Sequence, residues 1–146
     1  RCILWGANHY HGTLPDSGRW LVWDKRGGRP EFYGTNSFSD CELAWDSEDG
    51  PERMYRHIWN GIVRQGESVA KAGYSKLHPT EKPIELMRWC LSLCPESKIV
   101  LDPYMGSGTT VRAAKDLGRQ AIGIEIEECY CEVAARRLQQ EVLQFT

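Results

Sequence analysis

Two glycines and one acid, set at a fixed spacing, are the residues that could hold a small ligand. Gly106 and Gly108 enclose Ser107 in a turn, where a Cβ atom would obstruct a tight bend or a close-lying ligand. Glu125 follows 19 residues after Gly106, close to the roughly 20-residue offset at which a carboxylate reaches a ribose hydroxyl. Its two oxygens can accept hydrogen bonds from two vicinal hydroxyls at once. The spacing therefore predicts a ribose-binding site.

The same stretch lacks the residues that bind a polyphosphate. A phosphate-binding loop places lysine after its last glycine, whereas Thr109 follows Gly108 here. The dinucleotide-binding pattern needs a third glycine, and Val111 stands at that position. We therefore expect a ligand that carries a ribose but no polyphosphate. The alternative is that the glycines form only a turn.

The flanking residues are expected to form half of a nucleotide-binding α/β unit. Residues 99–101 are apolar and rich in β-branched side chains, which is typical of a buried parallel strand. Pro103 ends that strand, because proline has no amide to donate. A helix is expected over 109–117 and a second strand over 120–124. Ligands of such sheets bind at the carboxyl ends of the strands, where the glycines and the acid lie.

The remaining elements are expected from shorter patterns. Apolar runs predict strands over 2–5, 20–23 and 42–45, and helical periodicity predicts helices over 84–94 and 127–143. Residues 46–74 have poor periodicity and several glycines, so a loop or a short helical insert is expected there.

Length and composition indicate a globular domain without disulfides or a structural metal. A chain of 146 residues with 41% hydrophobic residues can bury a core of its own. It has no apolar run near the roughly 20 residues of a membrane span, and no signal peptide is visible. Its six cysteines are expected to be reduced. The spacings Cys90-x-x-x-Cys94 and Cys129-x-Cys131 do not match zinc pairs, so no metal site is expected.

The net charge of −2 conceals two basic stretches. Residues 19–30 contain four cations and one acid, and residues 50–76 contain five cations and two acids, whereas residues 36–49 contain five acids and no base. A local basic surface supplies most of the sequence-independent affinity for DNA. The alternative is a solvated charged surface without a nucleic-acid partner.

Three segments together resemble the S-adenosylmethionine site of the DNA amino-methyltransferases, which methylate N6 of adenine or N4 of cytosine. They are HPTEKP at 78–83, DPYMGSGTT at 102–110 and GIEIEECYCEVAARRL at 123–138. Tyr104 stands where the family usually has phenylalanine, and Glu81 stands where glutamine is common. The resemblance implies an α/β, Rossmann-like methyltransferase fold with a mostly parallel sheet and flanking helices, incomplete at the N-terminus.

The resemblance also assigns residues and segments to roles. Residues 1–146 would form a single methyltransferase domain, with a short target-recognition insert at 46–76 and a cofactor-binding half at 77–146. S-adenosylmethionine would be held by His78, Thr80, Lys82, Asp102, Pro103, Tyr104, Gly106, Gly108, Thr109, Thr110 and Glu125. The cations of the two basic stretches would contact double-stranded DNA, and they are Lys25, Arg26, Arg53, Arg56 and Arg64. Because the insert is short, the choice of target sequence is expected to be short or loose.

The family's catalytic Asp/Ser/Asn-Pro-Pro-aromatic tetrapeptide is absent, because the sequence contains no Pro-Pro. The order of the segments resembles the permuted arrangement, in which this motif lies near the N-terminus, so it is expected upstream of Arg1. We therefore expect a fragment that has no catalytic residue, binds the cofactor weakly and turns over negligibly. An incomplete sheet edge could pair with another chain to form a dimer. C5-cytosine methylation is not favoured, since only the reversed pair Cys94-Pro95 occurs.

Two other classes of function stay open at this point. One is an S-adenosylmethionine-dependent methyltransferase of RNA, protein or a small molecule. The other is a non-catalytic, methylase-like DNA-binding module. A cytoplasmic location without membrane attachment is expected for each, and the motifs do not distinguish adenine from cytosine.

Overall fold

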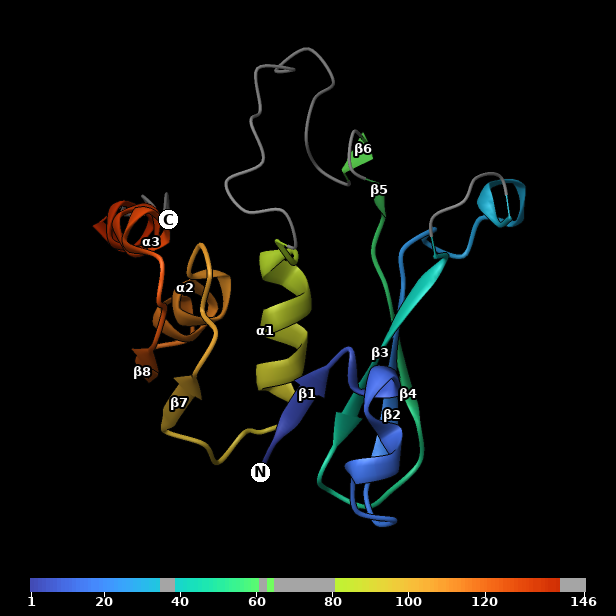
Figure 1. Ribbon diagram of the computed structural model, residues 1–146. Coiled ribbons are helices and arrows are strands. Elements are labelled where there is room, and N and C mark those ends of the chain that lie inside the picture. Colours follow the sequence, from blue (N-terminus) through green and yellow to red (C-terminus); the bar gives the residue numbers. More distant parts are fainter. Residues whose placement is uncertain (35–38, 61–62, 65–80, 140–146) are drawn as a thin grey trace, which may run out of the picture. The chain divides into compact units, whose positions relative to one another are not determined.

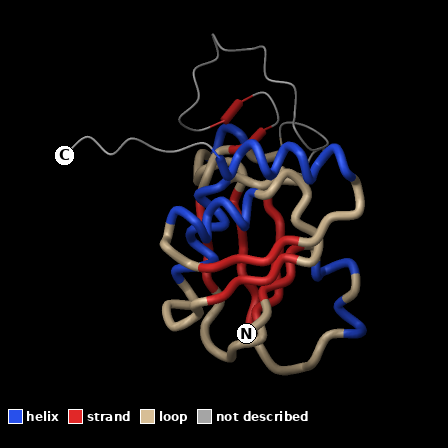
Figure 2. Tube along the Cα trace, turned by 90° about the vertical axis from the view of Figure 1, so that its left-hand side faces the viewer, coloured by secondary structure: helices blue, strands red, loops and turns tan. Residues whose placement is uncertain are grey.

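The computed structural model describes residues 1–34, 39–60, 63–64 and 81–139. The chain divides into two compact units, Arg1–Ala72 and Gly73–Thr146, whose helices and strands are distinguished by colour in Figure 2. The boundary falls close to residue 77, where the cofactor-binding half is expected to begin. A single methyltransferase domain over 1–146 stays a prediction.

The N-terminal unit contains a four-stranded sheet (Figure 1). Its strands are β1 (Ile3–Trp5), β2 (Arg19–Asp24), β3 (Cys41–Asp46) and β4 (Arg53–Arg56), in the order β1-β3-β2-β4. β3 pairs antiparallel with both β1 and β2, whereas β2 pairs parallel with β4. The three strands predicted in this half are confirmed. Shorter elements are β5 (Trp59–Asn60), β6 (Val63–Arg64) and the 3-10 helices η1 (Ala7–His9), η2 (His11–Thr13) and η3 (Pro30–Phe32).

The prediction of a loop or helical insert over 46–74 is wrong for β4. The strand pairs in register with β2, Leu21 with Arg53 through Asp24 with Arg56. That pairing depends on a partner about thirty residues earlier in the chain, which periodicity within the segment does not reveal. β4 therefore forms an edge of the sheet rather than an excursion from it.

The core of this unit is built on the central strands. Leu21 and Ala44 are fully buried and Trp23 is 1% exposed. The Trp23 ring meets Trp5 edge to face at 6.3 Å, and its Nε1 donates to the carbonyl of His57 at 3.1 Å. Trp23 is thus a core residue whose one polar atom is satisfied.

A buried carboxylate joins three strands at one end of the same sheet. Asp46, at the end of β3, is fully buried and accepts hydrogen bonds from Nε and Nη2 of Arg1 at 2.9 and 2.6 Å and from Nε of Arg19 at 2.9 Å. Burial alone would raise the pKa of Asp46, but the hydrogen bonds from Arg1 and Arg19 outweigh it, and the pKa is lowered. The ionised carboxylate therefore stabilises the folded sheet.

The Asp46→Asn variant should lose about 3 kcal/mol of unfolding free energy at neutral pH, because it leaves the guanidinium groups of Arg1 and Arg19, whose side chains are only 17% and 11% exposed, without their counter-charge. Since the folded pKa lies below the unfolded value, the contribution of Asp46 is present above the unfolded pKa and is lost as pH falls through the folded pKa. Urea unfolding followed by tryptophan fluorescence from pH 7 to pH 3 should show a shallower acid dependence in the variant. The exposed Asp16→Asn variant is the control; equal losses from the two variants would contradict this account.

The C-terminal unit has the predicted strand–helix–strand order. β7 (Ile99–Asp102) and β8 (Gln120–Gly123) pair in parallel, and α2 (Thr109–Asp116) connects them. α2 contacts both strands and also packs against α1 (Ile84–Ser92) and α3 (Glu128–Gln139) (Figure 1). The buried face of α1 is formed by Leu86, Met87, Cys90 and Leu91.

The two faces of the β7–β8 pair differ. On one face, α2 lies so close that a Cβ on Gly123 would be 3.0 Å from Cγ2 of Val111 and 2.3 Å from Sδ of Met105. On the other face, the alternate side chains are 54–61% exposed, and they are Ile99, Leu101, Ile122 and Ile124. The described part of the chain thus covers one side of this parallel pair and leaves the other side apolar and open.

Candidate nucleoside-binding site

The glycine loop begins where β7 and β8 end together. The amide of Ile124 donates to the carbonyl of Asp102 at 2.9 Å, and the amide of Met105 donates to the carbonyl of Ile124 at 2.9 Å. Oδ1 of Asp102 accepts from the amide of Tyr104 at 3.1 Å and so shapes the first bend. Gly106 and Gly108 have φ values of +51° and +78°, in the left-handed region that favours glycine.

Glu125 is held by the backbone at this edge. One carboxylate oxygen accepts from the amide of Gly106 at 2.9 Å. The other accepts from the amides of Ile126 and Glu127 at 2.8 and 3.0 Å. Charge-assisted bonds of this kind are the stronger hydrogen bonds of proteins. The predicted ribose acceptor therefore also fixes the loop, and its carboxylate is oriented before any ligand binds.

α3 packs against the glycine loop at Gly108. Gly108 precedes α2 as its N-cap residue, and a Cβ placed on Gly108 would lie 2.7 Å from Cβ of Ala134. Ala134 is 1% exposed. Glycine is therefore needed at 108 for two reasons, its positive φ and the close approach of α3.

Comparing Gly108 with Gly118 separates the effect of the positive φ from the effect of the contact with α3. Gly118 has a φ of +68°, but a Cβ there would meet nothing within 4 Å. Gly118→Ala should therefore cost only the left-handed strain of about 1–2 kcal/mol. Gly108→Ala should cost clearly more, because α3 must also move. Thermal unfolding of both variants measures the difference, and equal melting temperatures would show that α3 does not press on the loop.

One side chain connects this loop to the segment before α1. Nη1 of Arg137, on α3, donates to Oγ of Ser107 at 3.2 Å and to Oγ1 of Thr109 at 2.8 Å. Nη2 of Arg137 donates to Oε1 of Glu81. Glu81 and Arg137 are 56 positions apart, so no local spacing in the sequence could have indicated the pair. We refer to Glu81, Ser107, Thr109 and Arg137 as the loop anchor.

The predicted cofactor residues fall into three groups. Asp102, Pro103, Tyr104, Gly106, Gly108 and Glu125 lie together at the carboxyl edge of β7 and β8, and Thr109 and Thr110 begin α2. Lys82 is half-buried just before α1. His78 and Thr80 lie outside the described residues. Tyr104 is 87% exposed and Ile126 is 93% exposed, so two large apolar side chains border the site and could cover a flat ring.

The predicted DNA-contacting residues are not equally available. Arg53 is exposed, and the Arg56 side chain is 64% exposed, both on the edge strand β4. The Lys25 side chain is 15% exposed and lies 3.3 Å from Oε1 of Glu42. Arg64 belongs to β6, and its side chain lies outside the described residues.

Arg26 requires a correction. It is fully buried, and its Nε donates to Oδ1 of Asp40 at 2.7 Å, which lowers the pKa of Asp40. A buried guanidinium committed to a carboxylate cannot meet a phosphate, so the assignment of Arg26 to DNA contact does not hold. The sequence could not indicate this, because burial of Arg26 follows from the turn after β2.

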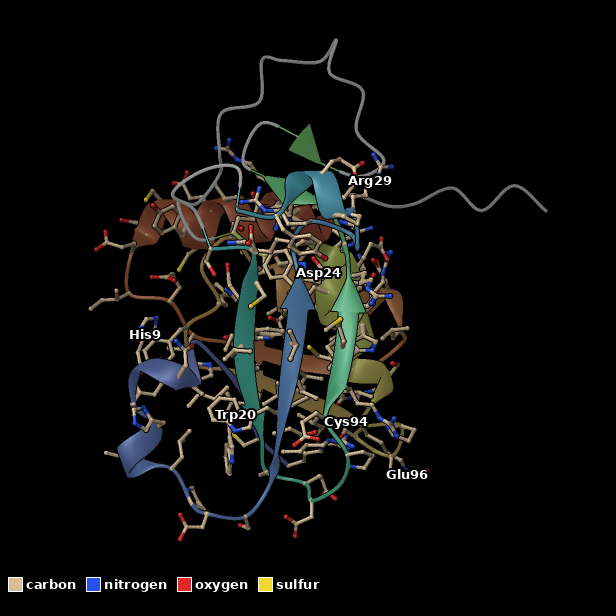
Figure 3. All side chains as sticks on the ribbon, turned by 90° about the vertical axis from the view of Figure 1, so that its right-hand side faces the viewer. His9, Trp20, Asp24, Arg29, Cys94 and Glu96 are labelled. Atoms are coloured by element: carbon tan, nitrogen blue, oxygen red, sulfur yellow. The ribbon has the colours of Figure 1, made fainter. Side chains whose placement is uncertain are left out.

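Asp24 organises that turn. Figure 3 shows Asp24 at the carboxyl end of β2, with Arg29 in the loop beyond it and Trp20 toward the start of the strand. The Asp24 carboxylate accepts from the amides of Arg26 and Gly28 at 2.9 and 2.8 Å and from the hydroxyl of Tyr33 at 2.6 Å. The bond to Asp24 raises the pKa of Tyr33. Nε of Arg56 lies 3.5 Å from the same carboxylate, which orients this exposed arginine.

Other features of the described residues do not point to a different functional site. They contain no cluster of His, Cys, Asp and Glu that could hold a metal ion, and none of their helices has the length and apolar character to cross a bilayer. An open pocket of about 580 Å³ is lined by residues such as Lys98, Leu117 and Gln120. It lies where β7 and β8 begin, whereas ligands of such sheets bind where the strands end.

The fold is that of an α/β protein with a candidate nucleoside site at the carboxyl ends of β7 and β8, and comparison with known proteins gives the family. Residues 20–136 match the N6/N4 methyltransferase family model, described as DNA methylase. The chain belongs to this family of DNA methylases. It is 33% identical over 138 residues to the type II methyltransferase M.HinfI of Haemophilus influenzae, covering 82% of this chain and 38% of that protein. It is 38% identical over 105 residues to the type II methyltransferase M2.DpnII of Streptococcus pneumoniae, covering 71% of this chain and 37% of that protein.

Solved structures agree with the family. The crystal structure of an M1.HpyAVI–SAM complex matches with a TM-score of 0.61 and 26% identity, covering 93% of this chain and 73% of that one. A second crystal structure, of M1.HpyAVI, matches with a TM-score of 0.56 and 26% identity, covering 94% of this chain and 72% of that one. These matches confirm the predicted Rossmann-like methyltransferase fold class. The expected mostly parallel sheet is not what the described strands of the N-terminal unit form, because β3 pairs antiparallel with both β1 and β2. The chain spans less than two fifths of the length of each of the two curated relatives.

Proposed function

We propose that this chain supplies the S-adenosylmethionine site and part of the DNA surface of an amino-methyltransferase that modifies N6 of adenine or N4 of cytosine. The observation that carries the proposal is the Glu125 carboxylate, fixed by three backbone amides at the carboxyl edge of two parallel strands. A ribose hydroxyl is a donor that such a carboxylate can accept. The adjacent loop offers no lysine for a phosphate, which suits a nucleoside that carries no 5′ phosphate.

The described residues fit this cofactor. Glu125 would accept from the ribose, and the loop from Tyr104 to Gly108 would let the ligand approach the backbone. Tyr104 and Ile126 offer exposed apolar surface to a purine ring at the same edge. When bound, the cofactor supplies an electrophilic methyl group on a sulfonium. These residues would hold the methyl group in line with the incoming amine. Positioning of this kind accounts for much of the rate in such reactions.

Methyl transfer also requires residues that position the target amine. An exocyclic amine is a poor nucleophile because its lone pair is delocalised into the base. Acceptors for the amine's hydrogens and a ring to stack on the extruded base are needed. We assign no catalytic residue to this chain. We further expect residues 1–146 alone to bind the cofactor weakly and to transfer methyl groups negligibly.

The surface proposed to face DNA is the edge strand β4 (Arg53–Arg56). Arg53 and Arg56 are exposed there, and the exposed Met54 lies between them. Arg64 and Lys25 remain predicted contacts of the same partner. A cytoplasmic location is in keeping with six cysteines that form no disulfide. Dimerisation through an unpaired sheet edge stays a prediction.

The Glu125→Ala variant tests the cofactor assignment. It should lower the affinity for S-adenosylmethionine about 10- to 100-fold, because a hydrogen bond to a charged group contributes about 1.5–3 kcal/mol. Isothermal titration calorimetry measures the change, and Glu127→Gln, an exposed acid two positions later, is the control for charge. Unchanged affinity in Glu125→Ala would overturn the assignment.

The Arg53→Gln/Arg56→Gln double variant tests the DNA surface. It should weaken binding to duplex DNA and reduce the slope of log K against log salt concentration by about 2, since each phosphate contact contributes about 0.9. Fluorescence anisotropy over a range of salt concentrations gives both quantities. The control is Arg136→Gln on α3, whose side chain is 80% exposed. An unaltered slope in the double variant would favour a methyltransferase whose substrate is not a nucleic acid.

A further inference from the structure

The loop anchor brings three separate segments to one guanidinium. Arg137 on α3 reaches Ser107 between the two loop glycines, Thr109 at the start of α2, and Glu81 just before α1. Oγ of Ser107 also lies 3.5 Å from Oε1 of Glu81. Arginine suits this position because its planar group donates in several fixed directions at once.

The side chains of the loop anchor are largely buried, which strengthens the hydrogen bonds between them. The side chains of Glu81 and Arg137 are 8% and 20% exposed, and Ser107 and Thr109 are 3% and 8% exposed. Water competes weakly for donors and acceptors in such surroundings, and charge-assisted bonds are correspondingly stronger. The Glu81 carboxylate is therefore held against the loop rather than hydrated at the surface.

The backbone of α3 near Arg137 is fixed independently of the Arg137 side chain. Nη1 of Arg112 donates to the carbonyl of Arg137 at 2.7 Å, and Nζ of Lys115 donates to the carbonyl of Leu138 at 2.6 Å. Two cations from α2 thus meet carbonyls in the last turn of α3, where the helix dipole favours positive charge. Ala134 already packs on Gly108. Shortening the Arg137 side chain should therefore leave α3 in place.

We propose that Arg137 is a positioning residue, which holds the segment at Glu81 and Lys82 against the glycine loop so that one ligand can touch both. The inference rests on the proposed S-adenosylmethionine site. Glu125 binds the loop at Gly106, whereas Glu81 approaches it at Ser107. The ribose therefore belongs to the Glu125 end, and the amino-acid tail of the cofactor extends toward the segment that Arg137 holds.

This assignment predicts different losses for two ligands. Arg137→Ala should lower the affinity for S-adenosylmethionine about tenfold or more, since it removes charge-assisted bonds that orient one wall of the site. The affinity for adenosine, which lacks the amino-acid tail, should fall less than threefold, because Glu125 and its amides are untouched. Arg137→Lys should give an intermediate loss for S-adenosylmethionine, because one ammonium cannot reproduce the three-way fork.

The experiment is calorimetric titration of the 146-residue chain with each ligand, alongside thermal unfolding without ligand. The control is Arg136→Ala, a change in the neighbouring, solvent-exposed arginine. Glu81→Ala should resemble Arg137→Ala, and the double variant should lose little more than either single variant, because both changes disrupt one connection.

The outcomes separate this inference from the proposed function. If the unmodified chain binds neither ligand, the cofactor site itself is wrong. If it binds both, equal losses for the two ligands in Arg137→Ala would make Arg137 a general support of the fold and overturn its positioning role. No loss for either ligand would overturn that role too.

Discussion

The hydrogen bond from the amide of Gly106 to the Glu125 carboxylate is the interaction on which the C-terminal unit depends. It joins the loop that follows β7 to Glu125, two residues after the end of β8, so both strand ends are fixed to each other beyond the paired residues. Parallel strands cannot be closed by a tight hairpin, so this bond acts together with those from Ile124 to Asp102 and from Met105 to Ile124 to hold the two ends in place. One acid therefore serves two purposes, since the group that closes the edge is also the group that a ribose would meet.

Small residues make this closure possible by letting helices approach the backbone. α2 lies over Gly123, and α3 lies over Gly108, each at a distance that a methyl group would obstruct. This close packing limits the directions in which the loop can move. A flexible sequence of glycines thus becomes a defined surface, with its rigidity supplied from outside the loop by α2, α3 and the anchor at Arg137.

The parts of this structure that could be predicted from the sequence are those determined by neighbouring residues. Strand β7, the glycine turn, α2 and the acid after β8 follow one another within 28 residues, so periodicity, turn chemistry and spacing are all visible together. β4 was missed because its stability comes from parallel pairing with β2. The anchor was missed because Glu81 and Arg137 meet only after three helices have packed. In both cases the deciding contact is distant in sequence.

The basic stretch at 19–30 shows why a charge count along the sequence is a poor guide to a DNA surface. In the antiparallel register of β2 with β3, Arg19 stands opposite Asp46, and the acids of 40–46 come to face the cations of 19–26. Ion pairs join Arg19 to Asp46, Lys25 to Glu42 and Arg26 to Asp40. The basic stretch and the acidic stretch are therefore two sides of one hairpin, and much of their charge is used to hold it together. β4 is an edge strand. Its Arg53 is exposed, and the side chain of Arg56, although 3.5 Å from Asp24, stays 64% exposed. Exposed arginines at that edge keep their long-range field, which makes the second basic stretch the better candidate for a polyanionic partner.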